Sequence, residues 1–127
     1  MSIERLPKNP ATGFSDTVTT SGPGRLIHVA GNVGFGADGT VVPGGMGAEA
    51  RATFDNIERT LKAAGAEMSH VIKINAFVTS LEEYPAYAEA RAERFGELLP
   101  ASATVQVAGL LVGAQIEIDA VAFVPES

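Results

Sequence analysis

With 127 residues, 46% of them hydrophobic and 19% charged, the chain has the size and composition of one globular domain covering residues 1–127. Its formal net charge is −6 and its nine Lys and Arg residues are scattered along the sequence. The chain therefore lacks the basic stripe that binding to nucleic acid requires. The same lack of clustered positive charge argues against docking on an anionic membrane. The absence of cysteine excludes disulfides, thiolate catalysis and Cys-ligated zinc.

The N-terminal segment, MSIERLPKNP, lacks the apolar stretch of a signal peptide. No apolar run in the chain approaches the length of a bilayer-spanning helix. We therefore expect a cytoplasmic protein with no membrane or nucleic-acid partner.

The first elements predicted are two short strands. Residues 17–21 are rich in Thr and Val, residues 25–30 read RLIHVA, and Gly22-Pro23-Gly24 between them is a turn signal. We therefore expect residues 17–30 to form a hairpin. The glycine-rich stretch 31–47 that follows contains further turns, with Val41 and Val42 as a short edge strand.

A helix is predicted over residues 47–64. Its apolar residues recur at spacings of four, three, four and three, which places them on one face. Gly65 stands where a left-handed residue ends the helix, because glycine has no Cβ to clash there. The residues of the buried face are Ala50, Phe54, Ile57, Leu61 and Ala64.

The next predicted elements are a strand over residues 71–79 and a second helix. Ser80 followed by Glu83 fits a capping box, and Pro85 is tolerated in a first helical turn. Gly96 ends this helix. One helical face is predicted to carry Tyr84, Ala88, Arg91 and Phe95.

Strands over residues 103–107 and 115–124 complete the predicted order, which is a hairpin, a helix, a strand, a helix and two strands. This order predicts an α+β fold with two helices packed on one face of a mixed sheet. The opposite face carries small and polar residues together with Phe77. Because a sheet of this size rarely leaves apolar side chains in water, we expect a subunit interface to cover it.

Four segments in this order carry a resemblance to a known family: LIHVAGNVG (26–34), LKAAGAEMSHVIKINAFV (61–78), PASATVQVAGL (100–110) and IEIDAVAF (116–123). Over positions 9–123 the chain resembles the RidA/YjgF (reactive intermediate deaminase) family. The resemblance implies a chorismate-mutase-like fold, a homotrimer with ligand clefts between subunits, and hydrolysis of reactive enamine/imine intermediates to keto acids and ammonia. It implies no metal and no organic cofactor. The acidic composition gives the family's older name, endoribonuclease L-PSP, no support.

When the family's site residues are matched by position to this sequence, the resemblance implies a site that departs from the family pattern. In typical members an arginine of a Pro-Ala-Arg-Ser segment grips the substrate carboxylate, and Ser102 occupies that position here. Serine brings no charge and cannot replace a guanidinium fork. We therefore expect small α-carboxylate imines to bind weakly, which favours a less anionic or bulkier substrate. Thr104 falls where the family often has Cys or Thr.

Other implied substrate contacts come from the first third of the chain. Ser15 stands where the family has a tyrosine, with Phe14 beside it. Ala30 replaces an expected serine and is followed by Gly31 and Asn32, whose backbone is expected to approach a ligand. In the second helix, Ala88 replaces an expected asparagine.

Glu117 matches the acidic residue with which the family orders a water, and it is the one charged member of the implied site that is kept. In the functional interpretation, it positions or deprotonates that water. In the alternative, Glu117 and Asp119 are both solvated or interface carboxylates. His28 and His70 match no metal spacing, and structural roles are favoured for both. Gly31 has an equally plausible interpretation as a strand-end turn.

Two functions therefore stand side by side. The first is a cofactor-independent enamine/imine deaminase with altered substrate choice, in which Glu117 acts on water. The second is a non-catalytic trimer that binds a small metabolite in its clefts. The uncharged residues at Ser102, Ala88 and Ser15 favour the binding protein, and the retained Glu117 favours the enzyme.

Overall fold

The computed structural model describes residues 2–7 and 12–126. In this part of the chain, short 3-10 turns at Met68–His70, Leu81–Glu83 and Leu111–Gly113 connect the longer elements. None of its helices is long and apolar enough to cross a membrane. The strands and α-helices, in chain order, are β1 (Ile3–Leu6), β2 (Thr17–Thr20), β3 (Gly24–Asn32), α1 (Met46–Ala63), β4 (Val71–Val78), α2 (Tyr84–Phe95), β5 (Ala101–Gln106) and β6 (Ile116–Pro125).

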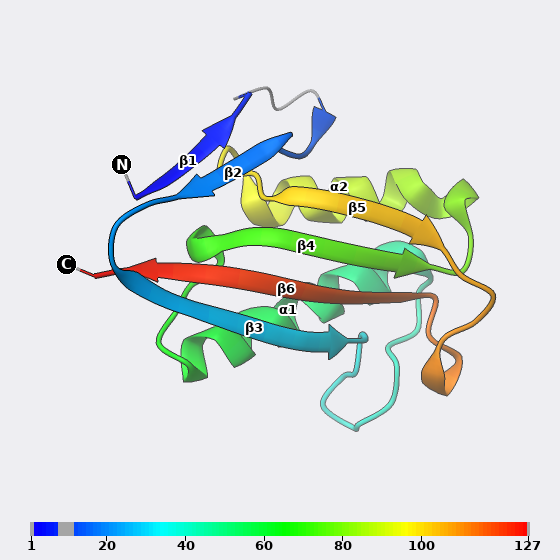
Figure 1. Ribbon diagram of the computed structural model, residues 1–127. Helices are drawn as coiled ribbons and strands as arrows, with labels where there is room; N and C mark the ends of the chain where they lie inside the picture. Colours follow the sequence, from blue (N-terminus) through cyan, green and yellow to red (C-terminus); the bar gives the residue numbers. More distant parts are fainter. Residues whose placement is uncertain (1, 8–11, 127) are drawn as a thin grey trace.

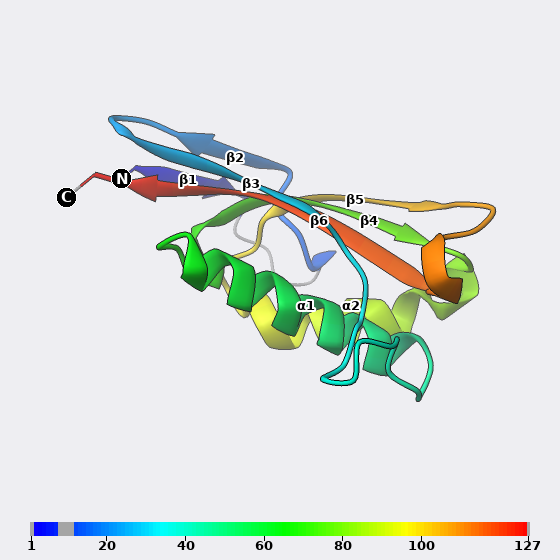
Figure 2. The ribbon, with the colours of Figure 1, turned by 90° about the horizontal axis from the view of Figure 1, so that it is seen from below.

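A four-stranded mixed sheet forms the centre of the fold (Figure 1), in the order β3-β6-β4-β5. Strand β6 runs antiparallel to β3 and β4, whereas β4 and β5 are parallel and are joined through α2. Both helices lie on the same face of the sheet, and the other face carries no helix (Figure 2). The predicted α+β architecture with two helices on one face is therefore confirmed.

Alternation along β6 separates these two faces. Ile116 and Ile118 are buried toward the helices, whereas Glu117 and Asp119 are half-buried on the open face. Period-two alternation of this kind places successive side chains on opposite faces of a strand. Gln115, which the alternation placed beside Glu117, instead lies just before the strand begins.

The core fills the space between the helices and the sheet, with Phe54 of α1 near its centre. Its ring stacks on Tyr87 at a centroid distance of 6.3 Å and meets Phe95 edge-on at 5.5 Å. Such aromatic pairs add to the stabilisation from burial alone. The predicted face of α1 is confirmed, except that Ala64 follows the helix and is exposed. Gly65 is left-handed, with φ 83°.

The expected hairpin over residues 17–30 is wrong. Strand β2 pairs with β1, from Ile3 opposite Thr20 to Leu6 opposite Thr17, while β3 pairs with β6. Strand β6 offers a long, alternating apolar partner that buries one face of β3 against α1, whereas the short TVTT strand offers little apolar surface. Tertiary burial therefore outweighs the local turn signal at Gly22-Pro23-Gly24.

Three other details differ from the sequence prediction. Ser80 makes no side-chain cap; a 3-10 turn follows it, and α2 begins at Tyr84. The predicted edge strand at Val41 is a single bridge to Phe35. The buried face of α2 includes Tyr87 where Ala88 was expected, because a spacing of three after Tyr84 and four before Arg91 also keeps one helical face. Its buried residues are Tyr87, Ala90, Arg91 and Phe95.

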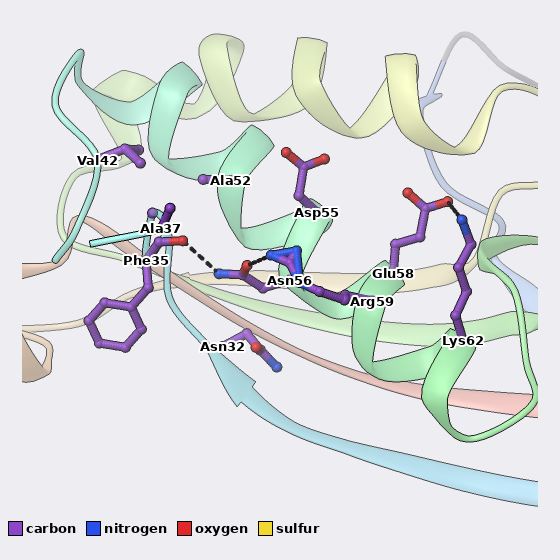
Figure 3. A pocket seen from close by; sticks show the side chains of 11 residues that line it. Asn32, Phe35, Ala37, Val42, Ala52, Asp55, Asn56, Glu58, Arg59 and Lys62 are labelled. Carbon is purple, nitrogen blue, oxygen red and sulfur yellow. Dashed lines mark hydrogen bonds and ion pairs between the residues drawn. The ribbon is translucent and has the colours of Figure 1, made fainter. Parts of the chain in front are cut away.

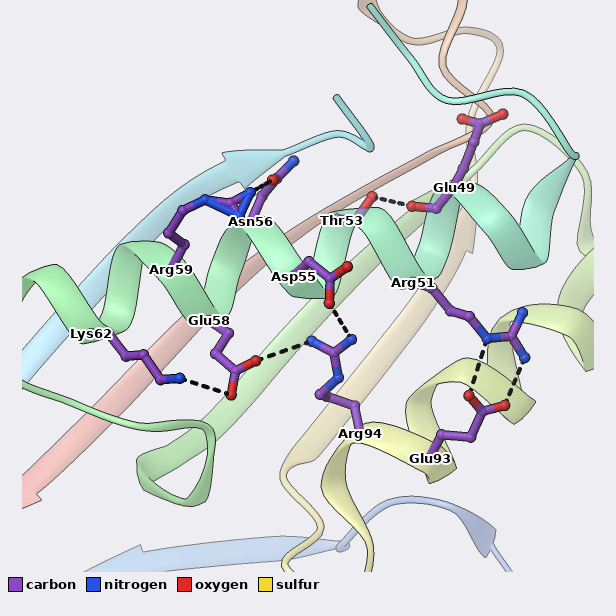
Figure 4. Close-up of polar contacts among 10 residues, drawn as sticks. All are labelled: Glu49, Arg51, Thr53, Asp55, Asn56, Glu58, Arg59, Lys62, Glu93 and Arg94. Atoms are coloured by element: carbon purple, nitrogen blue, oxygen red, sulfur yellow. Dashed lines mark hydrogen bonds and ion pairs between the residues drawn. The ribbon is translucent and has the colours of Figure 1, made fainter. Parts of the chain in front are cut away.

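Ion pairs join the outer surfaces of the two helices (Figure 4). Arg51 donates to Glu93 at 3.0 and 2.6 Å, and Arg94 donates to Asp55 at 2.5 Å. Because Arg51 and Glu93 are solvated, at 42% and 51% exposure of their side chains, their pair adds little to the stability. The Arg94 side chain is only 22% exposed. The pairs do show that α1 and α2 provide their outer arginines with carboxylate partners.

Candidate active site

The implied site residues at the end of β3 lie beside the implied acid. The pairing of β3 with β6 shifts between Val29 and Asn32, which is a β-bulge. Within this bulge, a Cβ built on Gly31 would lie 2.3 Å from Oε2 of Glu117. Only glycine therefore fits beside this carboxylate as it stands, and the open face presents Glu117 next to exposed backbone.

Two polar contacts fix the surroundings of Glu117. The Asn32 side chain donates from Nδ2 to the carbonyl of Ala30 at 2.8 Å, across the bulge. At the start of β6, the buried Glu49 carboxylate accepts the backbone N–H of Gln115 at 2.9 Å and its side-chain amide at 2.8 Å. The helix therefore anchors β6 two residues before Glu117.

Ser15 lies away from Glu117, next to the start of β5. Its backbone N–H donates to Pro100 at 3.0 Å and its hydroxyl donates to the carbonyl of Leu99 at 2.6 Å. The residue is only 2% exposed. Its hydroxyl is thus committed to holding the segment before β2 against β5, with Phe14 at the edge of the contact.

Ser102 and Thr104 share the face of β5 that is turned toward α2, where they meet Tyr87. Burial raises the pKa of the Tyr87 hydroxyl, while the charge of Arg91 and the nearby polar groups of Ser102 and Thr104 oppose that rise. Among the described residues, neither the Tyr87 hydroxyl nor Oγ of Ser102 has a hydrogen-bond partner of good geometry. The two hydroxyls lie close enough to interact with each other, since Ser102 lowers the pKa of Tyr87 through a side-chain contact.

Arg91 completes this cluster and was not predicted as a site residue. Its Nη2 donates to the Tyr84 hydroxyl at 3.1 Å, and its guanidinium lies 5.2 to 5.8 Å from the ring centroids of Phe14, Tyr84 and Tyr87. The signal was present in the sequence, because residues 84, 87 and 91 are spaced by three and four along one helix face. The α2–β5 cluster is defined as Phe14, Ser15, Tyr84, Tyr87, Arg91, Ser102 and Thr104.

The implied site residues thus fall into two groups within one chain. Gly31, Asn32 and Glu117 lie around the bulge of β3 and β6, and the Glu117 side chain is on the open face. The α2–β5 cluster lies on the helix face, at the sheet edge formed by β5. A single chain therefore does not bring Glu117 and Ser102 to the same cleft.

The neighbouring hollow between α1 and the loop 35–42 has a volume of about 770 Å³ (Figure 3). Of the implied site residues, only Asn32 lines it. Its lining residue Asn56 donates to the carbonyls of Val33 and Phe35 and accepts from Arg59. These contacts hold the loop on the helix, so Asn56 has a structural role.

The histidines lie apart from both groups. His28 is on β3 opposite Val121, and Nδ1 of His70 accepts the backbone N–H of Glu67 at 3.0 Å, which closes the turn before β4. Within the described residues, no three His, Asp or Glu side chains gather in a way that could hold a metal ion.

Comparison with known proteins places this α+β fold in a defined class. The Endoribonuclease L-PSP family matches residues 5–124, and the chain therefore belongs to this family, which includes the RidA/YjgF proteins. A 2-iminobutanoate/2-iminopropanoate deaminase of Capra hircus is 35% identical over 99 residues, which are 77% of this chain and 72% of that one. A deaminase of the same name from Dermatophagoides farinae is 31% identical over 117 residues, which are 91% of this chain and 89% of that one. RidA from Psychrobacter sp. PAMC 21119 is similar in structure, with a TM-score of 0.75, 28% identity and coverage of 98% and 99%.

Proposed function

We propose that this protein is a homotrimeric deaminase that hydrolyses small enamine/imine compounds to the corresponding keto compounds and ammonia, in clefts between subunits. The observation that carries the proposal is the placement of Glu117 against Gly31, at a bulge where its carboxylate occupies the space that a Cβ would take. The names of the similar deaminases supply the reaction class.

Hydrolysis of an imine requires mainly that the protein positions a water molecule and a proton-transfer group next to the substrate. An enamine first tautomerises to the imine; water then adds to the C=N carbon, and the C–N bond breaks to release ammonia and leave a C=O group. Glu117 takes a proton from the attacking water and gives it to the imine nitrogen, which forms the carbinolamine. It then takes the proton of the new hydroxyl and gives it to the amino group as the C–N bond breaks, so ammonia leaves and the carboxylate is regenerated without a cofactor. Backbone N–H groups near Gly31 stabilise charge that develops on the substrate.

The separation of the two residue groups supports the proposed assembly of several copies. A cleft that uses both Glu117 and the α2–β5 cluster needs one group from each of two copies. The open sheet face also carries exposed apolar side chains, including Leu26 and Val105, and a subunit interface would remove them from water.

Charge on the open face is expected to break the assembly. Val105 is 47% exposed and pairs with Phe77 on this face, so Val105→Asp would place an unpaired carboxylate in the proposed interface. We expect light scattering at micromolar concentration to show a trimer for the wild type and smaller species for Val105→Asp. The control is Leu98→Asp, since Leu98 is equally exposed at 47% but lies after α2. A monomeric wild type would contradict the trimer.

The activity itself is tested with imines made in situ. An amino-acid oxidase acting on 2-aminobutanoate or alanine generates the imine, and its disappearance is followed with and without the protein. We expect faster hydrolysis than in buffer, together with matching release of ammonia. Binding of the product 2-oxobutanoate without any acceleration would instead support the alternative of a non-catalytic binding protein, which the replaced contact residues favour.

Gly31→Ala should lower this activity with little effect on stability. The new Cβ would displace the Glu117 carboxylate, which is the flexible end of a side chain and can move at low cost. A misplaced catalytic group typically costs up to about 100-fold in rate, and we expect about 10- to 100-fold here. The matched control is Gly109→Ala, because a Cβ at Gly109 meets nothing within 4 Å. Equal rates for both variants would show that the position of Glu117 does not matter.

A further inference from the structure

The hollow between α1 and the loop 35–42 is large enough for a ligand, and the proposed reaction does not use it. Its volume of about 770 Å³ is of the size that small-molecule sites have (Figure 3). The loop that follows β3 descends beside α1, so the hollow lies on the helix side of the sheet (Figure 2). Glu117 lies on the open face, and the hollow is therefore separate from the proposed catalytic group.

Hydrogen bonds fix the loop wall of the hollow. Val42 donates its backbone N–H to the carbonyl of Gly34 at 2.9 Å, which closes the loop on itself. The Asn56 side chain of α1 donates to the carbonyls of Val33 and Phe35 at 3.0 and 3.2 Å, which ties the loop to the helix. Because these contacts are made within the chain, the hollow exists before a ligand arrives, and binding costs little in ordering of the loop.

One end of the hollow is apolar. Phe35, Ala37 and Val42 line it from the loop, and Ala52 lines it from α1 (Figure 3). Phe35 is 40% exposed, so a ligand in the hollow would remove apolar surface from water. The charged lining residues follow Ala52 along α1, at positions 55–62, and they form the other end of the hollow.

Among the described residues, the charges at this second end leave one cation without an acid. Asp55 accepts a hydrogen bond from Arg94 at 2.5 Å, and the Glu58 carboxylate lies 3.7 Å from Arg94 and 3.8 Å from Lys62 (Figure 4). Arg59 has no carboxylate within 4.0 Å in the same part of the chain. The two acids are therefore already neutralised, and the guanidinium of Arg59 is the charge that an anion could meet.

Asn56 holds this guanidinium beside the hollow. Nη2 of Arg59 donates to Oδ1 of Asn56 at 2.6 Å, and the Asn56 amide is itself fixed by the two loop carbonyls. A guanidinium has five N–H donors in a planar fork, which matches the oxygens of an acidic group. The contact with Asn56 positions the fork and leaves other donors for a ligand.

We propose that the hollow binds an amphipathic anion, an aromatic molecule with one acidic group. Its rings cover the apolar end, and its acid accepts hydrogen bonds from Arg59. The seven residues from Ala52 to Arg59 rise about 10 Å along the helix axis, which matches the length of a molecule with two or three rings. The inference concerns a second site and does not rest on the proposed function.

A matched pair of fluorescent probes tests the class of ligand. Anilinonaphthalene sulfonate carries an acid, whereas phenylnaphthylamine has the same rings and no charge. We expect the wild type to prefer the sulfonate, and Arg59→Gln to lower affinity for the sulfonate by about 5- to 20-fold while affinity for the uncharged probe stays within about twofold. Arg51→Gln is the control, because Arg51 is on the same helix but is paired with Glu93 outside the hollow. Equal affinity of the wild type for the two probes would overturn the proposal.

A variant that fills the hollow tests the place of binding. Ala52 is half-buried, so Ala52→Phe places a ring in the hollow and not in the core, and we expect it to lower affinity for both probes by about tenfold or more. The matched control is Ala63→Phe, since Ala63 is exposed at the end of α1 and outside the hollow. Thermal unfolding without probe checks that both variants fold. Binding that is insensitive to both Ala52→Phe and Arg59→Gln would place the probe elsewhere and overturn the inference, whereas an absence of imine hydrolysis would contradict only the proposed function.

Discussion

Replacing Glu117 with Gln is expected to lower the rate of imine hydrolysis by about 100- to 10,000-fold, the usual contribution of a general acid–base group. The amide keeps the size of the side chain and its fit against Gly31, but it cannot accept the proton of the attacking water. Since Glu117 is half-buried on the open face, outside the core, melting temperature and trimer mass should stay close to those of the wild type.

The matched control for this change is Asp119→Asn. Asp119 lies on the same face of β6 and accepts a hydrogen bond from Nδ2 of Asn75 at 2.9 Å, which gives it a structural partner. We expect Asp119→Asn to retain most of the activity. Similar losses in the two variants would show that the charge of this face matters in general and that Glu117 is not the catalytic base.

The largest effect on stability is expected for Phe54→Ala. Phe54 is fully buried between Tyr87 and Phe95, so its truncation loses apolar burial and leaves a cavity, with an expected cost of about 3–5 kcal/mol in the free energy of unfolding. Phe35→Ala is the control, because Phe35 is 40% exposed and surface changes usually stay within about 0.5 kcal/mol.

Urea unfolding at one fixed protein concentration measures this difference, because the stability of an oligomer depends on concentration. An equal loss in the two variants would mean that the helices are not packed on the sheet through Phe54.

Regular periodicity made most of the fold predictable. The three-and-four spacing from Ala50 to Leu61 fixed the buried face of α1, and the alternation from Ile116 to Ala122 fixed the two faces of β6. The pairing of β2 was not predictable in the same way, because a turn signal is local, whereas strand partners depend on burial between segments far apart in the chain. The four residues of β1 carry no strong pattern of their own.

The candidate site was predictable only where residues could be matched by position. That argument found Glu117 and Gly31 and the structure places them together. It also identified Ser102 as the position where an uncharged residue replaces the family's arginine, but it could not show which side chains surround that position. Arg91 reaches the α2–β5 cluster from a helix, and only the packing of α2 against β5 shows that the two positions share one environment.

One measurement tests the two-subunit imine hydrolase most directly. Glu117→Gln and Arg91→Gln chains carrying different tags are co-expressed, and trimers that contain both are isolated through both tags. In a ring of three with head-to-tail interfaces, one of the three clefts then receives an intact Glu117 from one subunit and an intact Arg91 from the next. The account predicts about one third of the wild-type activity from two chains that are each impaired alone. Mixed trimers that are no more active than either variant would contradict it.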